Sequence, residues 1–292
     1  MEFIPQLIVD SVLLGGLYTL MVVGLSLSFG ITRVINFAHG EAIMLGGYGA
    51  YWAMKLTSAD PLIAMPFLMV MGGIAGFFIF RVLFSRILAA PAANQILLTF
   101  GLGLVLQNLA LTLWSGDQRS TNPVYVFSSF ELGDDTVVQV GRLIGFGVAT
   151  VLVGGLFLWL KYAEDGRASR ALAENRDAAV LMGINVQKIY AITFGVSTAL
   201  GVASGCIFSS LSAVTPFMGF GMLVKSFAII VLGGLGSVVG SVIGAFLLAF
   251  AETTVSYYMP NGNGWAEAVA FGILFFVLIL RPSGIAGHSM VD

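Results

Sequence analysis

The sequence predicts an all-α polytopic membrane protein with about eight or nine transmembrane helices. Hydrophobic residues make up 58% of the 292 residues and charged residues only 10%, whereas an ordinary soluble domain has about 25% charged residues. Several apolar runs reach the ~20 residues that a helix needs to cross a bilayer. The 37 glycines exceed average usage and are typical of membrane helices whose backbones approach closely. We therefore expect one transmembrane domain over residues 1–292, surrounded by the lipid bilayer.

Nine apolar segments predict the helices, and nine crossings place most basic residues on one side of the membrane. With eight crossings, Arg33 or the pair Arg81 and Arg86 would lie on the outer side, so nine is preferred. The segments are 7–31, 39–55, 61–84, 94–115, 143–160, 189–213, 222–234, 238–256 and 265–281.

The segment 222–234 is too short to cross the membrane alone. At 1.5 Å per residue it reaches about 20 Å, against ~30 Å of hydrocarbon. A glycine-dense stretch, Gly233–Gly240, follows it. Non-helical backbone at membrane depth is tolerated only inside protein or beside a water-filled cavity. We expect a broken or re-entrant helix near 222–240, with Gly233, Gly234 and Gly236 as candidate hinge or gate residues.

Basic residues predict the orientation. The hydrophilic segment 161–188 carries five basic residues, while 115–142 carries only Arg119 and Arg142. Because cytoplasmic loops are enriched in Lys and Arg, 161–188 should be cytoplasmic and the loop 116–141 extracytoplasmic. The N-terminus is then extracytoplasmic and the C-terminus cytoplasmic, with Lys225 among the four outer basic residues. Any repeat relating 7–115 to 189–281 would be inverted, although the two halves show no clear sequence similarity.

Composition and motifs exclude several functions. A net charge of −2 gives no basic footprint for nucleic acid. Cys206 is the only cysteine, which rules out an intrachain disulfide and the usual zinc cluster. No lysine follows a glycine, so there is no P-loop for ATP. Two histidines and no G-x-S-x-G motif make Ser/His/Asp catalysis implausible. We expect no enzyme activity, no catalytic residue, and no metal or cofactor bound by this chain.

The stretch 29–41 places ionisable residues between two apolar segments. An ionisable residue at the bilayer centre costs about 2.5–3.5 kcal/mol, so Arg33, His39 and Glu41 should lie near an interface or face a hydrated interior. Two interpretations stay open. Glu41 complements the dipole of helix 39–55 while His39 acts as a local cap, or these residues, with Asn36, line a gate at the inner mouth of a pathway.

Helix 94–115 carries polar residues in an otherwise apolar sequence. Thr99, Gln107 and Asn108 stand among Leu, Ile, Val and Gly. Interhelical hydrogen bonds are worth about 0.6 kcal/mol in membranes. These side chains therefore either join helices or line a pathway.

The segment Gly166–Asn185 reads as one short amphipathic helix closed by Gly183. Its apolar surface would consist of Ala171, Leu172, Val180, Leu181 and Met182. Such a helix lies at the membrane interface or docks into a cytoplasmic partner.

Four segments, in the same order as in a known family, carry a resemblance that covers nearly the whole chain. The sequence resembles the LivH-type permeases of branched-chain amino acid ABC importers. The Leu280–Gly284 ending is also similar. The four segments are Arg33-Val-Ile-Asn-Phe-Ala-His-Gly-Glu41, Gly166–Asn185, Thr215-Pro-Phe-Met-Gly-Phe220 and Val231-Leu-Gly-Gly-Leu-Gly-Ser237.

The resemblance implies a multi-pass subunit of the bacterial inner membrane that pairs with a LivM-type permease. It also implies two cytoplasmic ATPases, which hold ATP and Mg, and a periplasmic substrate-binding protein. By this likeness the segment 161–188 contains the ATPase-coupling helix. Its candidate residues are Arg170, Glu174, Asn175, Arg176, Asp177, Leu181, Met182 and Gly183.

Two departures leave the substrate open. Family members often carry an Arg-Pro-x-Arg cluster where this chain has Leu88–Asn94, and an Asn-Pro pair where it has Thr215-Pro216. Branched-chain or other hydrophobic amino acids are the expected cargo, with urea, short amides or other amino acids as the alternative. From different classes, an ion-coupled secondary transporter would use Glu41 and His39 as its coupling pair, and a non-transporting scaffold would move nothing.

Overall fold

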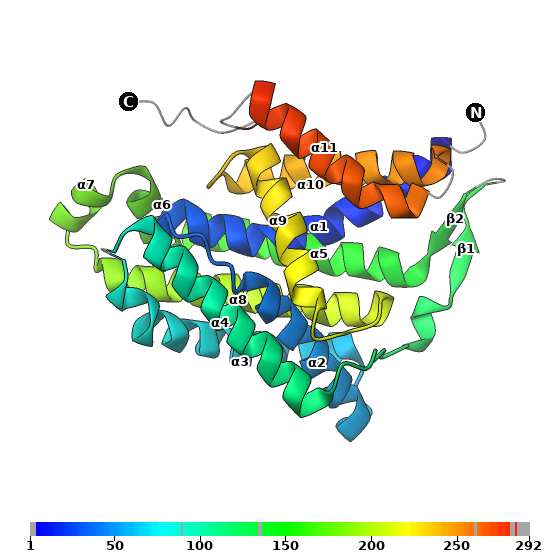
Figure 1. Cartoon of the computed structure of the whole chain (residues 1–292), viewed down its shortest axis with the longest axis horizontal. Helices are drawn as coiled ribbons and strands as arrows, with labels where there is room; N and C mark the ends of the chain where they lie inside the picture. The colour runs from blue at the N-terminus through cyan, green and yellow to red at the C-terminus, as the bar shows by residue number, and fades with distance from the viewer. Residues whose placement is uncertain (1–3, 89, 134–135, 260–261, 281–283, 285–292) are drawn as a thin grey trace.

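The computed structural model describes residues 4–88, 90–133, 136–259, 262–280 and Gly284, and it is almost entirely helical (Figure 1). The predicted all-α fold class is confirmed. Within the described residues there are eleven α-helices, two 3₁₀ turns and one small β-hairpin. The helices are α1 (Ile4–Thr32), α2 (His39–Thr57), α3 (Pro61–Val82), α4 (Ala92–Trp114), α5 (Val140–Tyr162), α6 (Glu164–Glu174), α7 (Arg176–Leu181), α8 (Val186–Leu211), α9 (Met218–Gly233), α10 (Val238–Tyr258) and α11 (Gly262–Leu280); the 3₁₀ turns are Phe84–Arg86 and Val124–Val126; the strands are β1 (Ser129–Glu131) and β2 (Val137–Gln139).

Each of the nine expected apolar segments corresponds to one helix, namely α1 to α5 and α8 to α11. Residue 281, the last of the ninth segment, lies outside the described residues. By length and composition, six helices of the described chain are long and apolar enough to cross a membrane: α1, α3, α4, α5, α8 and α10. Helix α9 is apolar but shorter, as its sequence predicts. The number of crossings, eight or nine, stays a prediction.

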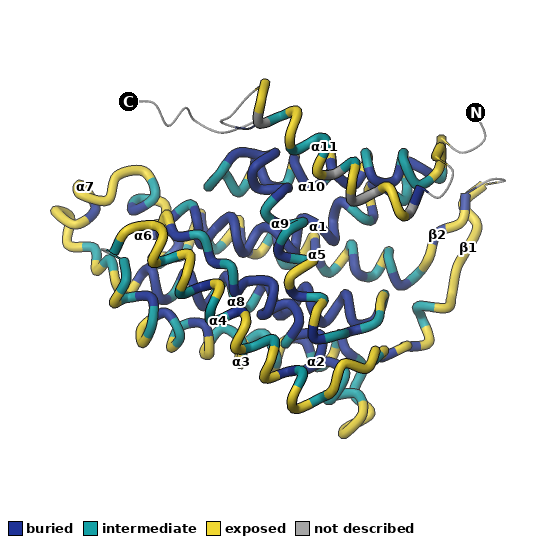
Figure 2. Tube along the Cα trace, viewed as in Figure 1, coloured by how far each residue is buried: buried dark blue, intermediate teal, exposed yellow. Residues whose placement is uncertain are grey.

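Helix α1 forms the centre of the molecule. It packs against α5, α8, α9 and α10, and the side chains of its Met21, Val22 and Val23 are fully buried. Helix α3 packs on α8, α2 lies against α8 and α9, and α11 covers α9 and α10. Helix α4 contacts mainly α2. Figure 2 accordingly shows buried backbone along α1, α8 and the start of α2, and exposed segments along α4 and α7.

The structure has two distinct ends (Figure 1). The α7 end carries α6, α7 and the last turn of α1, and the hairpin end carries the segment 115–139 with the antiparallel β1–β2 hairpin. The amide nitrogen of Gln6 donates to the carbonyl of Val137 at the hairpin end, over 3.0 Å. Gly284 packs on Gly234, whose turn meets the end of α1. The described chain therefore starts at one end and finishes at the other, and 116–139 lies opposite 161–185.

The prediction of a single helix over 166–185 is wrong. Helix α6 ends at Glu174 and α7 begins at Arg176, because Asn175 adopts an extended conformation (φ −151°, ψ 103°) and its side chain caps α7, accepting from the Ala178 amide at 2.9 Å. Asparagine favours such N-cap positions over helix interiors. The expected common apolar surface is also absent. Leu172 is buried, whereas Leu181 and Met182 are 87% and 83% exposed.

Candidate functional site

Helix α2 begins in the middle of the bundle rather than at its surface. Helix α1 ends at Thr32, and Arg33 has a left-handed conformation (φ 57°) that turns the chain back. The His39 Nε2 then lies 3.1 Å from the carbonyl oxygen of Met21. At 1.5 Å per residue, Met21 is about 16 Å inside the end of α1. The non-helical segment 33–38 therefore re-enters the bundle, and α2 begins near its mid-depth.

Helix α9 begins at the same depth but is reached from the opposite end. Helix α8 ends at Leu211, and the following segment pairs with the segment that follows α4, since the amide of Val214 donates to the carbonyl of Arg119 at 2.7 Å. The segment 212–217 then runs inward to Met218. The backbones of Gly40 in α2 and Gly219 in α9 touch, and a Cβ on Gly40 would overlap the carbonyl of Gly219. The N-termini of α2 and α9 therefore meet.

The two units are alike in construction. Each has a long helix (α1 or α8), a six-residue non-helical segment (33–38 or 212–217) and a helix that starts in the interior. They enter from opposite ends of the molecule, which is the relation expected from the sequence for any repeat that relates the two halves. Discontinuous helices whose N-termini meet near mid-membrane are the usual construction of substrate sites in transporters with inverted repeats.

Glu41 lies at this junction. Its side chain is only 5% exposed, and Oε2 has no hydrogen-bond partner among the described residues. A Cβ on Gly219 would stand 2.6 Å from Oε2, and one on Gly103 of α4 would stand 3.8 Å from the Glu41 Cγ. The carboxyl therefore fills the space between α4 and α9. The positive ends of the α2 and α9 helix dipoles converge there.

His39, Asn36 and Thr99 fix the backbone around Glu41. The His39 imidazole packs between Gly24 and Gly201, and no side chain caps α2, so His39 is not a local cap. Asn36 Oδ1 accepts from the Ala38 amide at 3.0 Å. The hydroxyl of Thr99 donates to the Ile35 carbonyl at 3.3 Å, which attaches α4 to the re-entrant segment.

A mainly apolar cavity of about 280 Å³ lies between α2, α3, α4 and α8, with Asn36 in its wall. Gln107 and Asn108 lie further along α4. Gln107 is half-buried, whereas Asn108 is exposed and donates to the Leu104 carbonyl of its own helix at 2.8 Å. The structure therefore does not bring Asn108 to the junction around Glu41.

The glycine-rich turn lies at the α7 end, away from Glu41. Gly233 and Gly240 pack backbone to backbone where α9 meets α10, and Gly234 and Gly236 have positive φ values of 107° and 84°. A Cβ on Gly30 of α1 would stand 2.6 Å from the carbonyl oxygen of Gly236. The length of α9 separates this turn from the junction of α2 with α9.

A second buried polar centre was missed by sequence reasoning. Lys225 of α9 lies 3.1 Å from the Glu252 Oε1 of α10 and donates to the Tyr18 hydroxyl at 2.9 Å. Tyr18 donates in turn to the Glu252 Oε2 at 2.6 Å. The assignment of Lys225 to the outer surface is therefore wrong, because the lysine is paired inside the bundle. The sequence contains the signal for this pair, because Lys225 and Glu252 are opposite charges in two apolar segments, and such charges usually pair or mark a functional site.

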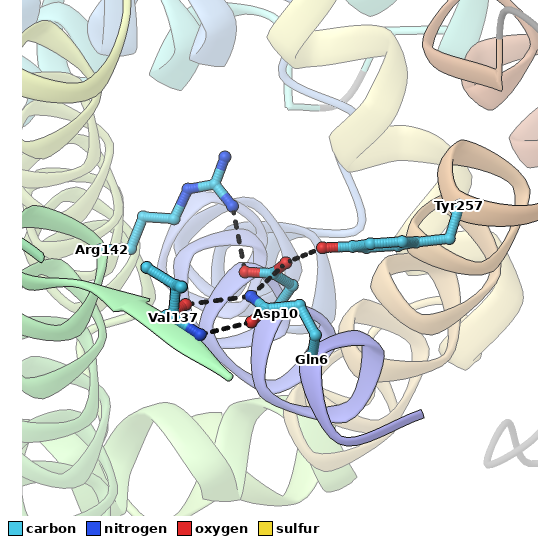
Figure 3. A network of polar contacts seen from close by, with 5 residues as sticks. All are labelled: Gln6, Asp10, Val137, Arg142 and Tyr257. Carbon is cyan, nitrogen blue, oxygen red and sulfur yellow. Dashed lines mark hydrogen bonds and ion pairs between the residues drawn. The ribbon is translucent and has the colours of Figure 1, made fainter. Parts of the chain in front are cut away.

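A further polar network closes the hairpin end of α1 (Figure 3). Asp10 accepts from the Tyr257 hydroxyl at 2.6 Å, from the Gln6 amide at 3.0 Å, and from Arg142 at 3.4 Å. A cavity of about 400 Å³ between α1, α5 and α10 is lined by this network and by Glu252. The two polar centres therefore share one cavity.

The residues proposed for ATPase coupling gather at the α7 end, and all of them are exposed: Arg170, Glu174, Asn175, Arg176, Asp177, Leu181, Met182 and Gly183. Helix α6 anchors them to the bundle. The hydroxyls of Ser169 and Thr193 lie 3.1 Å apart, Gly166 packs on the carbonyl of Trp159, and Leu172 is buried. Helix α7 therefore projects from a fixed base.

Comparisons with known proteins agree with this architecture. A family model described as a branched-chain amino acid transport system permease component matches residues 7–278. The high-affinity branched-chain amino acid transport system permease protein BraD of Pseudomonas aeruginosa is 31% identical, over 98% of this chain and 97% of that protein. The LivH permease proteins of Salmonella typhimurium and Escherichia coli are each 30% identical, over 99% of this chain and 97% of theirs. No solved structure matches the chain. The chain thus belongs to the family of permease components of branched-chain amino acid transport systems.

Proposed function

We propose that this chain is a permease subunit of an ABC importer that moves branched-chain or other hydrophobic amino acids into the cell by alternating access. It has no catalytic role, and partner ATPases bind Mg and hydrolyse ATP. A second permease completes the membrane unit, and a periplasmic binding protein delivers the substrate. The printed names of the relatives, which are permease proteins of branched-chain amino acid transport systems, support this cargo.

The observation that carries the proposal is the exposed tip of α7 on an anchored base. Leu181 and Met182 are 87% and 83% exposed, and Arg176 and Asp177 lie beside them. Isolated apolar side chains at a protruding tip fit a groove on a partner, where their burial is worth about 1.5–3 kcal/mol each. Because α6 is fixed to α5 and α8, a displacement of α7 would move the bundle with it.

The junction around Glu41 supports a pathway at the interior ends of α2 and α9. Asn36, His39, Glu41 and Thr99 surround or support it, and the α9–α10 turn is a hinge remote from it. Because α2 and α9 both start in the interior, the pathway between them could open toward either end of the molecule. ATP-driven closure of the ATPase pair would favour one of these two conformations.

Glu41→Gln tests the role of this carboxyl in the pathway. The variant should leave the assembly intact but reduce uptake, measured with the reconstituted complex. Normal uptake would show that Glu41 is not part of the pathway.

A double substitution at the tip of α7 tests the ATPase partnership. The variant L181S/M182S is measured in proteoliposomes with the partner permease, the ATPases and the leucine-loaded binding protein. It should lower stimulated ATP hydrolysis and leucine uptake at least tenfold, because it removes two apolar side chains that would be buried against the ATPase. The control L181M/M182L keeps the apolar surface and should retain both activities.

Normal hydrolysis and uptake by L181S/M182S would contradict the coupling role of α7. Uptake that persists without ATP and collapses with an ion gradient would instead favour a secondary transporter. Its coupling groups would then be sought at Glu41 and at the Lys225–Glu252 pair.

A further inference from the structure

Two separate cavities lie along α1, on the side where α5 and α10 pack. Both helices pack on α1. The ring of Phe146 from α5 lies on Gly16, and the ring of Phe246 from α10 lies on Gly15. These rings therefore pack on α1 between the two cavities. The cavity at the hairpin end holds the Asp10 network described above, and the other is at the α7 end.

The cavity at the α7 end combines a basic mouth with apolar walls. Its volume is about 480 Å³, and α1, α5, α6 and the α9–α10 turn line it. Lys161, in the last turn of α5, and Arg170, on α6, supply the positive charge. Phe157 lies one turn deeper on α5, and Val239 lies opposite on α10. Both apolar side chains are exposed, so the cavity opens sideways.

Neither of the two cations at this mouth forms an ion pair with a carboxylate among the described residues. Arg142, Lys188 and Lys225 each form an ion pair with a carboxylate. Lys161 instead stacks on the ring of Tyr162 at 5.2 Å. Two exposed positive charges at the end of a membrane helix, above an apolar recess, complement an anionic headgroup that carries an acyl chain. Basic pockets between membrane helices bind anionic lipid headgroups in this way.

We propose that the cavity at the α7 end binds an anionic glycerophospholipid from the adjacent leaflet. The phosphodiester lies between Lys161 and Arg170, and one acyl chain runs against Phe157 and Val239 toward the Phe146 and Phe246 rings. The lipid would contact α5, α6 and the turn at Gly236 together. It would therefore join the base of α7 to the α9–α10 turn.

Native mass spectrometry of the full-length protein tests the proposal, after exchange into micelles with equal phosphatidylcholine and phosphatidylglycerol. The wild-type protein should retain phosphatidylglycerol preferentially. Each cation near a membrane surface contributes about fivefold in affinity, so K161Q/R170Q should lower its retention roughly thirtyfold. The control R167Q/R176Q removes the same charge from exposed positions on α6 and α7 outside the cavity, and it should retain the lipid. Val239→Trp fills the recess without a change in charge and should also reduce retention.

Four results would overturn the lipid site. If the wild-type protein and K161Q/R170Q retain the lipid equally, Lys161 and Arg170 do not bind it. If R167Q/R176Q loses as much lipid as K161Q/R170Q, the effect depends only on net charge. Displacement of the lipid by excess inorganic phosphate, with no effect of Val239→Trp, would identify a site for free phosphate. Loss of the lipid when the partner permease binds would show that the cavity at the α7 end belongs to a subunit interface.

Discussion

Lys225 and Glu252 form the most buried of the three ion pairs in the described part of the chain. Their charges join α9 to α10, and the Tyr18 hydroxyl ties both to α1. A buried pair is costly to desolvate, but the removal of only one partner is costlier, because it leaves a buried charge without compensation. The pair therefore holds the short helix α9 in place on the central helix.

A double-mutant cycle at this pair should show strong coupling. Lys225→Met and Glu252→Gln should each destabilise the protein by about 3–5 kcal/mol. The double variant K225M/E252Q should be more stable than the sum of the two losses predicts, by about 0.5–3 kcal/mol. Thermal unfolding of the purified protein in detergent measures these differences. Strict additivity would mean that the two charges do not stabilise each other.

At the residue scale, sequence reasoning found Glu41 and His39 because ionisable residues are rare in apolar segments. It did not find the partners of Glu41, since Gly219 and Gly103 carry no chemical signal and meet Glu41 only through the tertiary fold. The Lys225–Glu252 pair was accessible to the same reasoning. It was missed because Lys225 was used only to count basic residues on each side of the membrane, and a partner for it within the bundle was not sought.

At the element scale, the apolar segments predicted all nine apolar helices. They did not predict the depth in the bundle at which each helix starts. Hydropathy measures the length of an apolar run and not its position along the membrane normal. The unusual composition of 29–41 was recognised, but neither 33–38 nor 212–217 was predicted to re-enter the bundle. The division between α6 and α7 was hidden for a different reason, because a single N-cap at Asn175 interrupts a continuous amphipathic pattern.

The α9–α10 turn should be intolerant of a side chain at Gly236. Its φ of 84° disfavours any L side chain by about 1–2 kcal/mol, and a Cβ there would stand 3.1 Å from the Cα of Gly30, where overpacking adds about 1–3 kcal/mol. Gly236→Ala should therefore lower the free energy of unfolding by about 2–5 kcal/mol, measured by thermal unfolding.

Gly221→Ala is the matched control for this change. Gly221 lies within α9, and a Cβ there meets nothing within 4 Å. Because alanine favours a helix interior over glycine, Gly221→Ala should leave stability unchanged or raise it by up to about 1 kcal/mol. Equal unfolding temperatures for the two variants would show that the turn does not need glycine at 236.

At the scale of the whole molecule, the family and the apolar helices make this chain a multi-pass inner membrane protein. The opposite placement of 116–139 and 161–185 was predictable from the distribution of basic residues. Which end faces the cytoplasm stays a prediction, because charge bias is the only observation that bears on it.

Thiol labelling of intact cells tests the orientation. The natural Cys206 is buried, so it should not react with a reagent in solution. Val124→Cys and Met182→Cys place thiols at positions whose side chains are 85% and 83% exposed at opposite ends. A membrane-impermeant maleimide should label the first in intact cells, after the outer membrane is made permeable, and the second only after lysis. The reverse pattern would place α7 outside and contradict its role toward cytoplasmic ATPases.

The contact of Gly284 with Gly234 links the last described residue to a turn made fifty residues earlier. A chain emerging from the ribosome can insert α9 and α10 long before this contact exists, since folding during synthesis proceeds from the N-terminus. The turn therefore receives this support only after residue 284 has been synthesised. Products truncated between residues 280 and 284 would carry every helix of the described chain and still lack the backbone that covers this hinge.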